Sequence, residues 1–177
     1  MSFAYAGYRA GGSLSLYLAQ RIGSGMVLTG AVGNPETGYR AFILGGGTHL
    51  RLSASAGLTA LVAGASTTDG PSARLYLLPK VTAGRFVVSA TAAANQPLGG
   101  ESRRWAAVDP LTAAVRLTSR VSVGPVATIE AAEGHALRAG VGPGVQLRLP
   151  GGTLSIEAVA ERPPSRVKFR GSFSGAL

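Results

Sequence analysis

The 177-residue chain contains no cysteine, only two histidines and few aromatic residues, which make up 6% of the sequence. The absence of cysteine excludes a disulfide framework and thiolate chemistry, and it leaves the redox compartment open. No run of about 18 apolar residues is present, so the sequence predicts no transmembrane helix. The N-terminal residues lack a basic segment followed by an apolar one, so no secretion signal is predicted.

Residue patterns typical of catalysis or metal binding are also missing. His49 and His135 are far apart, and neither has a second histidine at a metal-binding spacing. No G-x-S-x-G segment offers a serine nucleophile. The glycine clusters Gly45–Gly47, Gly99-Gly100 and Gly140–Gly144 lack the Lys-Ser/Thr of a P-loop, so we interpret them as turn glycines. We therefore expect a protein that is not an enzyme, with no catalytic residues, metal ligands or cofactor.

Acidic residues are scarce relative to basic ones. The chain has 17 Lys and Arg against 8 Asp and Glu, a net charge of +9, and fifteen of the cations are Arg. Such an excess favours docking on an acidic surface, for example anionic lipid or an acidic protein face. A GC-rich genome would also raise the content of Arg, Ala and Gly, and composition does not separate the two explanations. Nucleic acid is the least favoured partner, because the aromatic residues are too few and too dispersed to stack on bases.

The chain does contain many short segments in which apolar and polar residues alternate. Ser13–Gln20 alternates leucine with polar residues, as a half-buried strand does. Tyr39–Leu44 and Thr48–Ser55 are predicted as two strands, separated by the glycines Gly45–Gly47. We predict one all-β domain over residues 1–177, an antiparallel meander of about ten to twelve short strands. The meander closes as a barrel or folds as a two-sheet sandwich.

The clearest unit is a β-hairpin within Gly140–Glu161. Val145, Leu147 and Leu149 alternate with polar residues on its first strand, and Leu154, Ile156 and Ala158 do so on its second. Pro150-Gly151-Gly152 supplies the turn. Pairing Leu149 with Leu154 keeps the apolar residues together, and we expect them to form a core face.

The hairpin segments LTAAVRLTSRVSVGPVATIEA and ALRAGVGPGVQLRLPGGTLSIEAVAE resemble the strand–turn–strand units of bacterial outer-membrane β-barrels, and Val167–Phe173 resembles a closing strand. The resemblance implies a barrel that spans lipid. The sequence departs from that pattern in its scattered aromatic residues, its lack of a secretion signal and its Gly-Ala-Leu end. It would also require cations such as Arg74 and Arg85 to avoid the lipid face.

Two basic segments are the candidate partner-binding sites. In Arg162–Arg170, alternation places Arg166, Lys168 and Arg170 on one exposed face of a strand, opposite Val167 and Phe169. Cations on an edge strand also prevent sheet-to-sheet aggregation, which is the structural alternative. The second segment combines two cations with the only tryptophan, which we expect to insert at a lipid or protein interface: Arg103, Arg104 and Trp105.

These observations favour a non-enzymatic structural or accessory subunit. It would dock through its Arg-rich face on a larger acidic or membrane-embedded complex, such as a bioenergetic or envelope complex, or on anionic lipid. The predicted location is peripheral to a bacterial membrane, on its cytoplasmic side. The alternatives are a porin-like outer-membrane barrel and a β-barrel that binds an apolar ligand.

Overall fold

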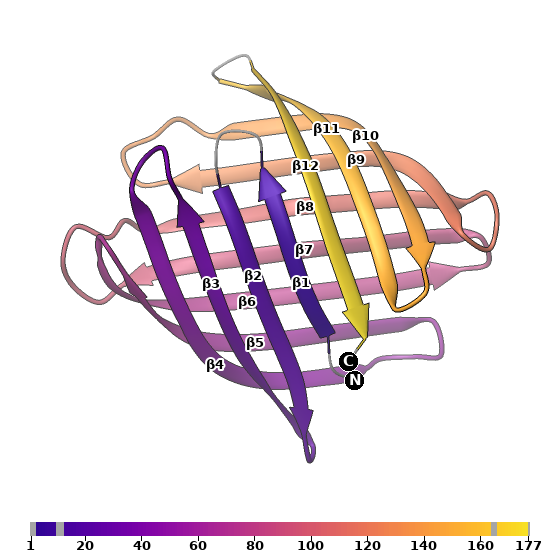
Figure 1. Cartoon of the computed structure of the whole chain (residues 1–177), viewed down its shortest axis with the longest axis horizontal. Coiled ribbons are helices and arrows are strands. Elements are labelled where there is room, and N and C mark those ends of the chain that lie inside the picture. Colours follow the sequence, from indigo (N-terminus) through magenta and orange to yellow (C-terminus); the bar gives the residue numbers. More distant parts are fainter. Residues whose placement is uncertain (1–2, 10–12, 164–165, 177) are drawn as a thin grey trace.

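The computed structural model describes residues 3–9, 13–163 and 166–176, and these form twelve antiparallel strands in one closed barrel (Figure 1). Each strand pairs with the next along the chain, and β1 pairs with β12 to close the sheet. The strands are β1 Phe3–Arg9, β2 Ser13–Ile22, β3 Gly25–Asn34, β4 Tyr39–Arg51, β5 Ala56–Thr67, β6 Gly70–Ala83, β7 Phe86–Pro97, β8 Trp105–Arg116, β9 Val121–Ala132, β10 Arg138–Leu149, β11 Gly152–Arg162 and β12 Arg166–Ala176. The predicted all-β fold is confirmed, and it closes as a barrel. No helix that could cross a membrane occurs among the described residues.

The alternation of side chains gives the barrel two very different faces. On β5, Val62 is 62% exposed, whereas its neighbour Leu61 is 2% exposed. Paired residues on adjacent antiparallel strands point to the same side of a sheet, so the strand registers extend this assignment around the barrel. Large apolar side chains occupy outward positions on β2 to β12, and the buried side chains point inward.

Charged residues are almost absent from the outward face. Among the described outward positions of β2 to β12, only Arg40 and Arg162 carry a charge. Arg40 is the second residue of β4, and Arg162 is the last residue of β11. The middle of the outer wall is therefore uncharged around the barrel.

The predicted hairpin of β10 and β11 is present, but its register and its apolar face differ from the prediction. Leu147 pairs with Leu154 and Val145 with Ile156, two residues away from the predicted pairing. A two-residue shift keeps apolar side chains together, so the pattern alone does not distinguish the registers. The tight turn determines the register, because only Pro150 and Gly151 lie between the strands, and Gly151 has a φ of 86°. The apolar face is no core, since it points away from the barrel.

Two of the three glycine clusters lie within strands, which corrects their interpretation as turns. Gly45–Gly47 falls in the middle of β4, so the two predicted strands of that region are one. Gly140–Gly144 lies in β10. A Cβ at Gly45 would stand 2.2 Å from the Val62 oxygen, and one at Gly142 would stand 1.8 Å from the Ala158 oxygen. Glycine is needed there because adjacent backbones approach too closely for a side chain.

We expect Gly142→Ala to lower the free energy of unfolding by about 1–3 kcal/mol, because the new methyl group overlaps the backbone of β11. Gly64→Ala is the matched control, since a Cβ there meets only the Leu44 oxygen, at 4.0 Å. Urea unfolding followed by the fluorescence of Trp105 measures both. Equal stability of the two variants would contradict the close approach.

Candidate functional site in the barrel interior

One half of the interior, formed by β2 to β6, is packed with apolar side chains. Tyr17 on β2 and Tyr76 on β6 meet edge to face, with ring centroids 6.2 Å apart. These strands are not neighbours in the sheet, so the contact crosses the interior. The buried cluster around it consists of Ala19, Met26, Leu28, Ile43, Leu61, Ala63, Ala65 and Tyr76.

The other half of the interior holds buried charges, with Arg170 of β12 at their centre. Arg170 donates through Nε to Glu157 Oε2 of β11 at 2.8 Å, and it also forms ion pairs with Glu157 and with Asp109 of β8. Three strands separate β8 from β12 along the sheet. The Arg170–Asp109 pair therefore ties opposite parts of the wall together across the interior.

A second ion pair lies beside the first. Lys168 Nζ is 2.6 Å from Glu161 Oε1, and the Thr128 hydroxyl donates to the same oxygen at 3.5 Å. The cavity between these groups and Arg170 has a volume of about 10 Å³, room for about one water molecule. The polar side chains of this group are therefore closely packed.

Asp109 lies just before a bulge in β8. Ala92 pairs with Val108 but Ala90 pairs with Leu111, so β8 has one residue more than β7 between these pairs. Asp109 continues the inward alternation of Trp105 and Ala107, and the extra residue moves the inward positions that follow to Thr112 and Ala114. The sequence interpretation did not identify Asp109 as a member of a charged cluster.

A third polar group lies where the loops between β3 and β4 and between β7 and β8 leave the barrel. Arg74 of β6 donates to Asn95 Oδ1 at 3.2 Å and to Tyr39 Oη at 2.8 Å. Asn95 in turn donates to the Arg103 carbonyl oxygen at 2.8 Å, and the Arg74 guanidinium lies 5.8 Å from the centre of the Trp105 ring. The expectation that Arg74 avoids the outward face is met.

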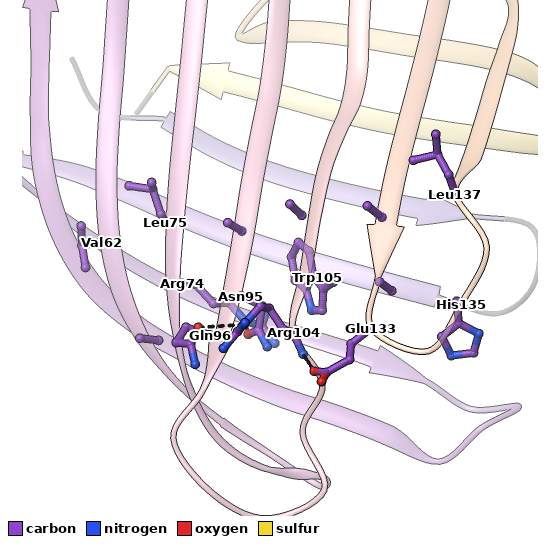
Figure 2. Close-up of a pocket in the computed structure, with 15 residues that line it drawn as sticks. Val62, Arg74, Leu75, Asn95, Gln96, Arg104, Trp105, Glu133, His135 and Leu137 are labelled. Carbon is purple, nitrogen blue, oxygen red and sulfur yellow. Dashed lines mark hydrogen bonds between the residues drawn. The ribbon is translucent and has the colours of Figure 1, made fainter.

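A hollow of about 750 Å³ lies beside this group and involves β5 to β9 (Figure 2). Arg104 lies at its edge, donating through Nε to Gln96 Oε1 at 3.1 Å and through its backbone N–H to Glu133 Oε2 at 3.4 Å. The hollow is present because the outward-facing residues on its floor are alanines, and no larger side chain fills it: Ala73, Ala94, Ala106 and Ala131.

The structure corrects the exposure that we predicted for the cationic strand. Lys168 and Arg170 point inward and are largely buried in ion pairs. Arg166 lies in β12 opposite Glu161, but its side chain is outside the described part of the chain. Arg162 is exposed, on the outward face. β12 pairs on both sides and is not an edge, so the protection of an edge is no explanation for its cations.

The second predicted segment divides in two. Arg103 and Arg104 are exposed in the loop between β7 and β8, whereas Trp105 begins β8 and faces Arg74. Trp105 is therefore not placed to insert at an interface. Ligand binding by any residue of the two segments stays a prediction.

The acidic partners of the cationic strand were not predicted, although the sequence holds a signal for them. Glu157 and Glu161 alternate with the apolar residues of β11, as Lys168 and Arg170 do in β12. Pairing the polar faces of two successive strands would have brought opposite charges together. Among the described residues, no three His, Cys, Asp or Glu side chains are grouped so that they could hold a metal ion.

Solved structures similar to this barrel include two porins and an outer-membrane protein. The NanC porin is similar over 100% of both chains, with a TM-score of 0.68 and 9% sequence identity. The KdgM porin in complex with disordered oligogalacturonate is similar over 99% of this chain and 98% of its own, with a TM-score of 0.68 and 8% identity. Omp33 of Acinetobacter baumannii covers 99% of this chain and 96% of its own at a TM-score of 0.52 and 11% identity. These similarities establish the fold. No family model and no curated protein matches the chain.

The resemblance to outer-membrane barrels is confirmed at the level of fold, and the leading functional hypothesis is wrong. A peripheral accessory subunit needs an Arg-rich docking face, but Arg170 and Lys168 lie inside a barrel whose architecture is that of porins. The expected partners, a larger membrane-embedded complex or anionic lipid, fall with that hypothesis. So does the placement on the cytoplasmic side of a membrane.

We expect Arg170→Ala to lower the free energy of unfolding by about 3–5 kcal/mol, because it leaves the buried carboxylates of Asp109 and Glu157 without their cation. Adding Asp109→Asn and Glu157→Gln should recover much of this loss, since the uncompensated charges are then removed. Urea unfolding of the single and triple variants measures the difference. A triple variant less stable than Arg170→Ala would contradict the role of charge compensation.

Proposed function

We propose that the protein is a porin-like outer-membrane β-barrel of a bacterium, a non-enzymatic channel protein with the ion pair of Arg170 and Asp109 across its interior. The observation that carries the proposal is the uncharged outer wall, with its exposed apolar side chains on β2 to β12. An apolar surface that encircles a protein promotes aggregation in water, whereas a barrel that spans lipid requires such a surface.

The dimensions of the strands fit a bilayer. β2 to β12 are 10 to 14 residues long, and about 9–11 residues suffice for a tilted strand to cross the hydrocarbon core. Closure of the sheet by β1 and β12 satisfies the backbone hydrogen bonds that an open edge would leave exposed to lipid. The chain can therefore cross a membrane with strands and without an exposed edge.

The interior supports a channel for small polar solutes. The inward positions carry most of the charged strand residues, as the water-filled interior of a porin does. The alternative of a barrel that binds an apolar ligand gains no support, because the apolar half of the interior is filled by its own side chains, among them Ile43 and Tyr76.

Refolding into bilayers tests the proposal directly. Chain diluted from urea into vesicles of a short-chain phosphatidylcholine should insert, migrate faster on gels before heating than after it, and become resistant to protease. A closed membrane barrel keeps its structure in the unheated sample, which accounts for the faster migration. A chain that stays soluble and folded without detergent or lipid would refute the proposal.

A pair of substitutions on the outer wall distinguishes lipid from water. Ile156 lies near the middle of β11 and Leu149 at the end of β10, and their side chains are 54% and 44% exposed. The two variants are Ile156→Arg and Leu149→Arg. In a bilayer, arginine should cost about 2–4 kcal/mol at the central position and at most about 1 kcal/mol near the interface.

The free energies of unfolding in vesicles, measured by urea titration, give this difference. In water, exposed positions tolerate such changes within about 0.5 kcal/mol, so two small and equal effects would contradict a lipid-facing wall.

A further inference from the structure

Charge is unevenly distributed along the axis of the barrel. The turns that join β2–β3, β4–β5, β6–β7, β8–β9 and β10–β11 lie at the end of the barrel where both termini lie, which we name the terminal mouth (Figure 1). The hairpin ends that form it, residues 19–28, 47–60, 78–90, 113–126 and 145–156, contain no acidic residue. They contain seven cations: Arg21, Arg51, Lys80, Arg85, Arg116, Arg120 and Arg148.

Five of these cations occupy inward positions, one on each hairpin. The strand registers establish this, because each cation pairs with a residue of the inward face; for example, Arg51 pairs with Gly57 and Lys80 with Ser89. The same holds for the other three pairs, Arg21 with Met26, Arg116 with Ser122 and Arg148 with Thr153. One inward cation from every hairpin forms a ring around the terminal mouth.

The opposite end of the barrel differs, because two of its inward cations lie beside acidic side chains. Lys168 pairs with Glu161 at 2.6 Å, and Arg138 lies 4.0 Å from Glu130. At the terminal mouth, by contrast, Arg51 donates to the Ser53 carbonyl oxygen at 3.3 Å. Within the described part of the chain, no acidic side chain forms an ion pair with Arg51, Lys80, Arg116 or Arg148.

From β7 to β11, several inward positions near the ring carry uncharged hydroxyl or amide side chains that are only partly buried: Ser89, Thr91, Ser122, Gln146, Thr153 and Ser155. On β2 and β3 the inward positions beside Arg21 are apolar instead, among them Ala19 and Met26. A ring of like charges between low-dielectric walls concentrates oppositely charged solutes. Arginine binds carboxylate and phosphate with two parallel hydrogen bonds, so a solute with several such groups can engage several members of the ring.

From this arrangement we propose that the terminal mouth binds soluble polyanions, molecules that carry several phosphate or carboxylate groups, at the entrance to the interior. The inference rests on the proposed function, because a membrane-spanning barrel presents this mouth to one aqueous compartment. Binding requires the ring and not the total charge of the chain.

Calorimetric titration with inorganic tripolyphosphate tests the site, using the full chain folded in a zwitterionic detergent at low ionic strength. The triple variant Arg51→Gln, Lys80→Gln, Arg148→Gln removes three ring cations. The control, Arg40→Gln, Arg103→Gln, Arg162→Gln, removes the same charge from exposed positions outside the mouth. We expect the ring variant to bind at least about tenfold more weakly and the control less than about threefold, since each direct contact to a charged group contributes more than 1 kcal/mol.

Absence of binding to the parent chain, or equal losses in both variants, would overturn the inference. So would retention by vesicles containing phosphatidylglycerol without any binding of tripolyphosphate, since the cations would then contact lipid headgroups. Heat-modifiable migration of each sample reports folding separately. A chain that folds as a barrel but binds no tripolyphosphate refutes the polyanion site alone, whereas one that does not fold in detergent or lipid refutes the proposed function.

Discussion

The pairing of β1 with β12 is the constraint on which the rest of the structure depends. Without it the chain would be a curved sheet with two open edges and no inside. With it, each strand has two neighbours, and the period-two alternation of side chains becomes a division between an outer wall and an interior. The burial of Lys168 and Arg170 follows from closure, because the same residues on an edge strand would face solvent.

Closure also explains why the interior can hold charges that the outer wall excludes. Arg170 meets Glu157 from the adjacent strand and Asp109 from across the barrel, so a desolvated cation has two carboxylates. The two carboxylates offset the cost of burying this guanidinium. Among the described outward positions of β2 to β12 no acidic side chain is present, and the cations there are Arg40 and Arg162 near strand ends.

The sequence allowed the fold class and the hairpin style to be predicted, because alternation and turns are local signals. It did not allow the side of the sheet to be predicted. The face that carries Leu147 and Ile156 could equally be a core face or a lipid-facing one. Alternation shows that the two faces of a sheet differ, but it does not show which of them contacts lipid. The glycines of β4 and β10 were misread as turns, because the close approach of a neighbouring backbone that requires them is a tertiary contact. Asp109 was missed for a similar reason, since its partner Arg170 lies on β12, which is not a neighbour of β8 in the sheet.

Basic residues have different surroundings at the two ends of the barrel. Lys168 and Arg138 at one end have acidic neighbours, so their charge is largely neutralised locally. Arg51, Lys80 and Arg148 at the other end have none among the described residues, so their field extends into solution. The excess positive charge of the chain is thus concentrated where a solute would enter. A GC-rich genome would account for the number of Arg residues, which lie at both ends of the barrel, but not for the absence of acidic residues from the five hairpin ends of the terminal mouth.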